Sequence, residues 1–389
     1  MSEQSEPEPL RPSRRGLLTG AIGGALGLAV GAGATAALTQ PRGAAVPSGA
    51  PEPVAAAGGH QAGIHRPHSP QRFGALVIAD VRAVESVWLA PLGERILELT
   101  STLEAFDVLP DGPGDLTVTV GLGPELVNRY GAGEFSLDDL PLFRGDEAID
   151  PVFIGGDVLL SAYSSDPTVL AAVLDDLLLL VPGAEVRWRQ FVFRGQGSGT
   201  KARNPLGFMD GIVVPKTNEE LADSVWIPDG PAAGGTVAVI RRLRLDTSAF
   251  RALEVGDREA VIGRRLADGA PLSGGRPDDQ VDLRAKTPEG EFLVPADAHA
   301  RAAHPSFTGS SLMLRRSYSF ENDGGTGADS GLVFMSFQNE QNTFTATQQR
   351  LDEVDALMAF TTPTASAVFL ILPGFDAQRP LGSTLGQAE

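Results

Sequence analysis

The chain alternates short strand-like stretches with helix-like segments, and the connections between them are too short for a series of parallel crossovers. The strand-like stretches lie at 76–81, 116–120, 157–163 and 186–193 in the first half, and at 237–245, 312–319, 332–337 and 367–372 in the second. Parallel strands need connections of roughly a dozen residues or more, so this spacing favours antiparallel pairing. We therefore predict an α+β fold of two halves, each an antiparallel sheet with helices on one face.

The helix-like segments separate these stretches in both halves. They lie at 84–106, 123–130 and 166–181, and again at 247–253, 257–265 and 343–360. The segment from 166 has a marked start, because Asp166 suits a helix N-cap and Pro167 suits the first helical turn. We expect loops at 195–204, 266–289 and 322–329.

The composition excludes several classes of function. The formal net charge of -18 repels phosphate backbones and anionic lipid surfaces, so we predict no nucleic-acid partner. The chain has no cysteine, which rules out disulfides, thiolate metal sites, iron–sulfur clusters and cysteine nucleophiles. Imidazole chemistry must therefore come from the five histidines, at positions 60, 65, 68, 299 and 304.

The first residues resemble a twin-arginine export signal. The pair Arg14-Arg15 precedes a mildly hydrophobic run rich in Ala and Gly over 17–38, with small residues that suit cleavage at 34–37. The alternative is a transmembrane anchor, since the run is just long enough to span a bilayer, although its many glycines make it a weak span. A Pro/Ala/Gly-rich linker follows over 40–57. We predict three segments: signal and linker 1–57, an N-terminal domain 58–205 and a C-terminal domain 206–389.

Three places in the mature chain could carry chemistry. His299 stands among small residues, so its ring could approach a flat cofactor, although a lone histidine is more often structural. Gly207 and Gly211 bracket Asp210, which could equally cap its own turn. In a strand, Arg315 and Arg316 point to opposite faces, so one faces inward and needs an anionic partner.

These places, with several others in the same order, make the chain similar to the dye-decolourising (DyP-type) haem peroxidases, in the branch of exported deferrochelatase/peroxidase proteins. The similarity covers about Gly59 to Phe375. It rests on Gly-Phe-Met-Asp-Gly (207–211), Asp-Ala-His-Ala-Arg (297–301) and Leu-Arg-Arg-Ser-Tyr (314–318), supported by 59–64, 115–121, 155–157, 203–204, 241–242 and 331–338.

The resemblance implies two ferredoxin-like domains, with haem b bound mainly by the C-terminal one. His299 would be the iron ligand, and Asp355 would accept the proton of its Nδ1 atom. Asp210 and Arg315 would be the catalytic pair, and Arg301 would lie near a haem propionate. Gly207 and Gly211 would shape the cofactor pocket.

The implied activity is reduction of hydrogen peroxide with oxidation of dyes or other organic donors through a ferryl intermediate. Asp210 would accept and return a proton, if a dry pocket brings its pKa toward the working pH. Arg315 would stabilise developing negative charge. Two alternatives stay open: deferrochelatase activity, which releases iron from haem, and a non-catalytic exported haem carrier.

Two departures from the family pattern occur. Ile-Val-Val-Pro follows the GxxDG motif at 212–215, and Ala-His-Pro stands at 303–305. The first could alter the substrate channel and the second the loop below the haem.

The predicted partners are peroxide, an organic reductant and the twin-arginine export machinery; a homo-oligomer is left open. Tyr318 is the first residue to test as a radical site.

Overall fold

The computed structural model describes residues 52–82, 85–101, 105, 107–132, 135–325 and 327–386. They belong to a unit that spans Gly49–Glu389. The predicted export signal, and the alternative anchor, lie outside the described residues. Within the described ranges, no helix is long and apolar enough to cross a membrane.

The first half runs strand, helix, strand, strand, helix, strand. Its strands pair in the order β4-β1-β3-β2, and every pairing is antiparallel. The elements are β1 (Phe73–Asp80), α1 (Leu89–Ser101), β2 (Thr117–Leu122), β3 (Val158–Ser164), α3 (Leu170–Leu178) and β4 (Glu185–Phe193). As predicted, Asp166 accepts a hydrogen bond from the N–H of Thr168 and so starts the helical segment.

The second half repeats this plan with longer insertions. Its strands pair in the equivalent order, β12-β8-β11-β10, again antiparallel. The elements are β8 (Thr236–Leu245), β10 (Tyr318–Glu321), β11 (Ser330–Gln338), α9 (Gln341–Val354) and β12 (Thr361–Ile371). Both halves therefore follow the β-α-β-β-α-β plan of ferredoxin-like units.

The two sheets join into one closed sheet, which the strand pattern did not predict. β2 pairs with β12, and β10 pairs with both β4 and β11, so the sheet closes on itself. Residues alternate between the two faces of each strand. The inward residues of both halves form one core, which includes Ile78, Tyr163, Ile240, Phe320 and Phe369.

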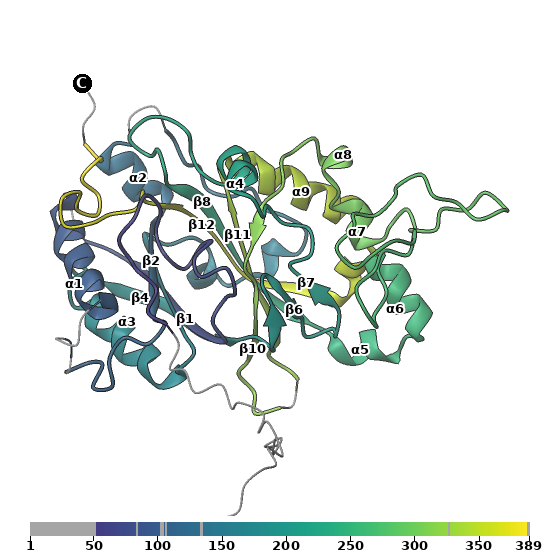
Figure 1. Cartoon of the computed structure of the whole chain (residues 1–389), viewed down its shortest axis with the longest axis horizontal. Coiled ribbons are helices and arrows are strands. Elements are labelled where there is room, and N and C mark those ends of the chain that lie inside the picture. The colour runs from purple at the N-terminus through teal and green to yellow at the C-terminus, as the bar shows by residue number, and fades with distance from the viewer. Residues whose placement is uncertain are drawn as a thin grey trace, which may run out of the picture. The chain divides into compact units, whose positions relative to one another are not determined.

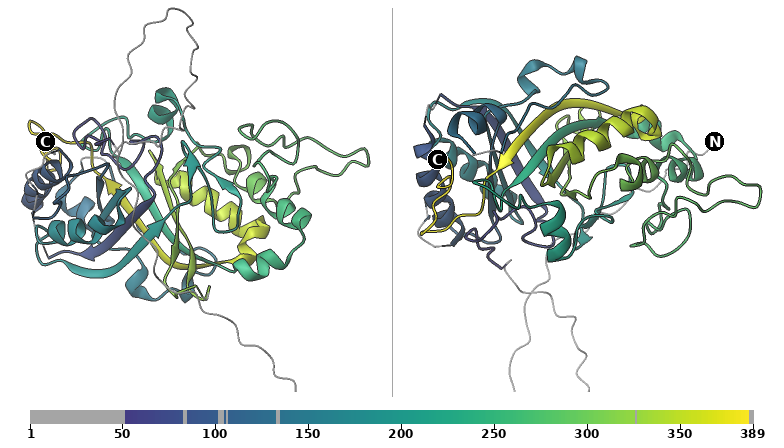
Figure 2. Two further views of the ribbon diagram at one scale, coloured as in Figure 1. Left: turned by 60° about the horizontal axis from the view of Figure 1, so that its bottom comes forward. Right: turned by 90° about the horizontal axis from the view of Figure 1, so that it is seen from above.

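The helices cover the outer face of the closed sheet. Leu92 and Ile96 of α1 and Val173 of α3 pack on the outward residues of the first half, such as Val118 and Leu160. Figures 1 and 2 show the helices of the two halves at opposite ends of the sheet, with α9 along the second half. A long connection between α6 (Val255–Ile262) and α7 (His299–Ala302) extends away from the body in both figures.

Short elements fill the remaining connections. A three-stranded sheet, β5-β6-β7, lies between the halves in sequence, and its first two strands fall in the stretch 195–204, where we predicted a loop. The predicted strand at 312–319 is interrupted at Arg316 and Ser317. The short elements are η1 (Ser86–Trp88), α2 (Pro124–Tyr130), η2 (Asp146–Ala148), η3 (Pro151–Phe153), η4 (Pro167–Val169), β5 (Gly197–Ser198), β6 (Lys201–Arg203), β7 (Met209–Asp210), α4 (Asn218–Ser224), α5 (Thr247–Ala252), α6 (Val255–Ile262), α7 (His299–Ala302), α8 (Pro305–Thr308), β9 (Leu314–Arg315) and η5 (Ala356–Phe360).

Candidate active site

A large cavity lies on the outer face of the second half's sheet, under α7 and α9. Its empty volume is about 1720 Å³, the open mouth included. Its floor comes from outward residues of β8, β11 and β12, and its walls are mainly apolar. The lining includes Phe208, Ile212, Val213, Leu243, Leu245, Ile262, Leu332, Phe334, Phe344, Leu351, Leu357 and Met358. We call it the His299 cavity. The mainly apolar lining suits a largely apolar ligand.

His299 is the first residue of α7 and lines this cavity, and a contact at Nδ1 orients its ring. Its Nδ1 atom lies 2.7 Å from Oδ2 of Asp355, the residue that ends α9 and caps η5. The N–H of Ala356 donates to the carbonyl of Asp297, which ties the two segments together. Within the described residues, Nε2 of His299 has no hydrogen-bond partner. The ring is therefore oriented through Nδ1, and Nε2 is left for a ligand.

The charge of Asp355 governs the histidine. Burial lowers the pKa of His299, but attraction by Asp355 and the hydrogen bond between them outweigh burial. The pKa is consequently raised from its ordinary value. The predicted contact between these two residues is present in the structure.

Asp210 reaches the same cavity from β7, at the end of a tightly turned loop. The side-chain oxygen of Asn204 accepts hydrogen bonds from the N–H groups of Leu206 and Phe208, which closes the turn. Gly207 has φ +90° and Gly211 has φ +75°. A Cβ on Gly211 would lie 2.1 Å from the carbonyl oxygen of Thr200, so only glycine fits there. Gly211 lines the cavity, whereas Gly207 shapes the turn beside it.

Arg315 faces Asp210 from β9. Its Nη2 atom lies 3.3 Å from Oδ1 of Asp210, and its Nη1 atom donates to the carbonyl of Val213 at 3.1 Å. Oδ1 of Asp210 also accepts from the N–H of Gly211 at 2.6 Å. The structure thus brings His299, Asp210 and Arg315 to one cavity.

The pKa of Asp210 differs in direction from our expectation. Burial raises the pKa of this carboxyl, as the dry pocket predicts, but the positive charge of Arg315 and the Gly211 N–H outweigh burial. The pKa is therefore lowered, and the carboxylate stays ionised. An ionised carboxylate can accept a proton before it donates one.

The partners of Arg316 differ from the expectation that the inward-facing arginine pairs with an anion. It is the more buried arginine of the pair, yet within the described residues its side chain pairs with no carboxylate. Its guanidinium donates to the carbonyls of Ile64 and Pro67 and contacts Oε1 of Gln71. The less buried Arg315 carries the anionic partner, and Arg316 ties the early loop to the closed sheet.

Arg301 does not line the His299 cavity. It donates to the carbonyl of Leu283, and its guanidinium lies 4.2 Å from the ring centre of Phe292. The reason is helical geometry, because residues two apart on a helix such as α7 point to different sides. Arg301 therefore supports the long connection between α6 and α7.

Two other arginines line the cavity, and neither was among the predicted site residues. Arg241 is fully buried and forms a two-pronged ion pair with Asp146, at 2.6 Å for each contact. Arg264 donates to the carbonyls of Gly269, Pro277 and Asp279. Arg241 stands in the Arg-Arg landmark at 241–242, but nothing in the local pattern showed which of the two faces outward.

Tyr318 lies inside the closed sheet. Its ring stacks on Tyr163 with ring centres 5.3 Å apart, and its hydroxyl donates to the carbonyl of Gln71 at 3.0 Å. A radical at this residue stays a prediction.

Comparisons with known proteins identify a family and its relatives. The family model described as "Dyp-type peroxidase, N-terminal" matches residues 61–194, and "Dyp-type peroxidase, C-terminal" matches residues 201–376. A dye-decolorizing peroxidase of Thermobifida fusca is 36% identical over 294 residues, 70% of this chain and 68% of that protein. A deferrochelatase of Yersinia pestis is 31% identical over 432 aligned residues, 99% of this chain and 97% of that protein.

Solved structures show the same similarity. The DyP-type peroxidase from Cellulomonas bogoriensis has a TM-score of 0.78 and 34% identity, covering 87% of this chain and 99% of that one. Ferric DtpA from Streptomyces lividans has a TM-score of 0.78 and 31% identity, covering 86% of this chain and 96% of that one.

Proposed function

Because the chain belongs to the DyP-type peroxidase family, we propose that it is a haem peroxidase in which His299 binds the iron and Asp210 and Arg315 activate hydrogen peroxide. One observation carries the proposal: an imidazole oriented by a buried carboxylate shares a large apolar cavity with a carboxylate–guanidinium pair.

The residues of the cavity fit haem b. Nε2 of His299 is the free nitrogen that an iron ligand needs. The apolar walls suit a porphyrin, and all the residues that line the cavity lie between 204 and 363. This placement supports haem binding by the C-terminal half. When bound, haem would supply the oxidising chemistry, while the protein sets charge and access.

The protein's own groups then have distinct tasks. Asp210, ionised beside Arg315, accepts a proton from peroxide and returns it to the departing oxygen. The guanidinium of Arg315 stabilises the negative charge that develops as the peroxide bond breaks. The N–H of Gly211 orients the carboxylate.

The test uses three variants of the holoprotein. We expect His299→Ala to alter the iron-ligand signature in the absorption and electron paramagnetic resonance spectra. We expect Asp210→Ala and Arg315→Leu to keep that signature and to lose the rapid absorbance change on mixing with peroxide. His304→Ala is the matched control, because His304 is the other histidine on the cavity wall. An unchanged peroxide reaction in both Asp210→Ala and Arg315→Leu would refute the proposal.

Release of iron from haem is the second candidate, favoured by the deferrochelatase relatives that match nearly the whole chain. The Asp210–Arg315 pair explains peroxide cleavage more directly. Product analysis separates the two activities: iron-free porphyrin as the main product would support iron release, and intact haem after many turnovers would support the peroxidase.

Export by the twin-arginine route is part of the proposal. It is supported by Arg14-Arg15 ahead of the Ala/Gly-rich run. Replacing both arginines with lysine should leave the protein inside the cell, and cell fractionation measures this. Unchanged export of the double variant would contradict the route.

A further inference from the structure

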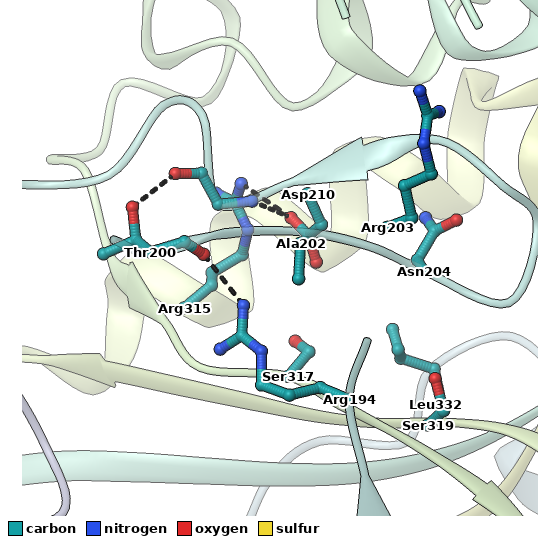
Figure 3. Close-up of a pocket in the computed structure, with 11 residues that line it drawn as sticks. Arg194, Thr200, Ala202, Arg203, Asn204, Asp210, Arg315, Ser317, Ser319 and Leu332 are labelled. Atoms are coloured by element: carbon teal, nitrogen blue, oxygen red, sulfur yellow. Dashed lines mark hydrogen bonds and ion pairs between the residues drawn. The ribbon is translucent and has the colours of Figure 1, made fainter. Parts of the chain in front are cut away.

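A second, smaller pocket shares Asp210, Gly211 and Arg315 with the His299 cavity. Its empty volume is about 330 Å³ with its opening, and its lining is mostly polar. Figure 3 shows Arg194, Thr200 and Ser317 around the catalytic pair. We call it the Arg194 pocket. Arg194 directly follows β4, so the end of the first half reaches a pocket whose other lining residues lie at 200–211, 315–319 and 332.

A chain of contacts runs from Arg194 to Asp210. Nη2 of Arg194 donates to the carbonyl oxygen of Thr200 at 3.0 Å. The hydroxyl of Thr200 donates to the carbonyl oxygen of Gly211 at 2.8 Å. The N–H of Gly211 donates to Oδ1 of Asp210 at 2.6 Å. Figure 3 marks each of these contacts with a dashed line.

The packing makes this chain stiff. The carbonyl oxygen of Thr200 occupies the space that a side chain on residue 211 would need, so the two peptide groups are in direct contact. β6 and β7 pair beside them, with Ala202 opposite Asp210. A shift of the Thr200 carbonyl would therefore displace Gly211, and with it the donor that aims the carboxylate of Asp210.

Arg194 is held firmly enough to set that position. Its N–H donates to the carbonyl of Arg72, the residue just before β1, at 2.9 Å. Its guanidinium lies 5.6 Å from the ring centre of the buried Tyr318. Its side-chain acceptor in the described chain is the carbonyl of Thr200 rather than a carboxylate. An ion pair therefore does not account for its place.

We propose that Arg194 is a positioning residue for Asp210, acting through Thr200 and Gly211. It holds the turn between β5 and β6 against the end of β4 and so fixes the carboxylate that moves the proton. The inference rests on the proposed role of Asp210. Misplacement of a reacting group by about 1 Å can cost on the order of a hundredfold in rate.

The experiment is a double-mutant cycle on the haem-loaded protein. We expect Arg194→Ala to slow the reaction with peroxide about ten- to a hundredfold, with an unchanged absorption spectrum. In an Asp210→Asn background, the same change should have almost no further effect, because its path to the reaction is already removed. A purely structural role would slow both backgrounds equally.

Two further variants serve as controls. Arg194→Lys keeps a cationic donor and should recover most of the rate. Arg189→Ala removes a nearby arginine on β4 that pairs with Asp175 on α3, and it should leave the rate unchanged. Cyanide binding to the ferric protein gives a readout apart from turnover. Hydrogen cyanide must lose its proton as it binds, so Arg194→Ala should slow its association as well.

The outcomes separate the two proposals. If Asp210→Asn reacts with peroxide at the normal rate, the role of Asp210 is wrong. If Asp210→Asn is slow but Arg194→Ala is normal, or if the two effects multiply, the inference about Arg194 alone is overturned.

Discussion

Nδ1 of His299 lies 2.7 Å from Oδ2 of Asp355, whose side chain has no solvent-exposed surface. A buried carboxylate on the second nitrogen makes an imidazole a stronger electron donor toward a metal. The orientation and the electron density of the proposed iron ligand therefore depend on Asp355, the residue that follows α9.

Replacing Asp355 with Asn should raise the reduction potential of the haem iron. The amide keeps an oxygen that can accept from the N–H of Leu357, so η5 stays capped, but the negative charge is lost. Spectroelectrochemical titration measures the potential. Asp352→Asn, on α9 and near the surface, is the control. If neither variant changes the reduction potential, the proposed role of Asp355 is wrong.

Replacing Asp210 with Asn should slow the reaction with peroxide by about a hundred- to ten-thousandfold, which is the range for loss of a general base. The haem spectrum should stay the same, because Asp210 is not the iron ligand. Stopped-flow mixing measures the rate. Asp268→Asn, in the loop after α6, is a matched change outside the catalytic pair, and similar rates in the two variants would count against Asp210.

The pH dependence of the same reaction should report the lowered pKa of Asp210. Only the ionised form accepts the proton. The rate should therefore stay constant as the pH falls through the ordinary aspartate range, and it should decrease only at lower pH. In Arg315→Leu the opposing charge is gone and burial remains, so the fall should begin at higher pH. A pH profile that does not move in Arg315→Leu would argue against this coupling.

Removing one partner of the buried ion pair of Arg241 and Asp146 should destabilise the fold strongly. Asp146→Ala leaves a fully buried guanidinium without its anion, which typically costs about 3–5 kcal/mol. Denaturant unfolding of the haem-free protein measures the loss. The exposed pair of Arg189 and Asp175 is the comparison, and Asp175→Ala should cost no more than about 1 kcal/mol. Equal losses in the two variants would contradict the argument.

Local patterns predicted most of the regular elements. β2, β4 and β8 appear close to their predicted positions, because each combines strand-like residues with clear end signals. The helix predicted over 343–360 ends at Val354, since Asp355 caps the turn that follows. The small sheet β5-β6-β7 was missed because its strands are only two or three residues long.

The site was harder to predict than the elements. The roles of His299, Asp210 and Arg315 came from resemblance, because the residues that meet in the cavity lie far apart in sequence. Alternation placed Arg315 and Arg316 on opposite faces but did not show which face meets the cavity. The lowered pKa of Asp210 depends on the distance to Arg315, which no sequence pattern contains.

The two places where the halves join in the closed sheet have a consequence for protein engineering. β2 meets β12 through two residue pairs, and β10 meets β4 through one. A cut between the halves would give each fragment two bare strand borders, whose unpaired backbone groups recruit other chains. Swapping halves among relatives should therefore yield soluble protein only where the residues along both borders are exchanged together.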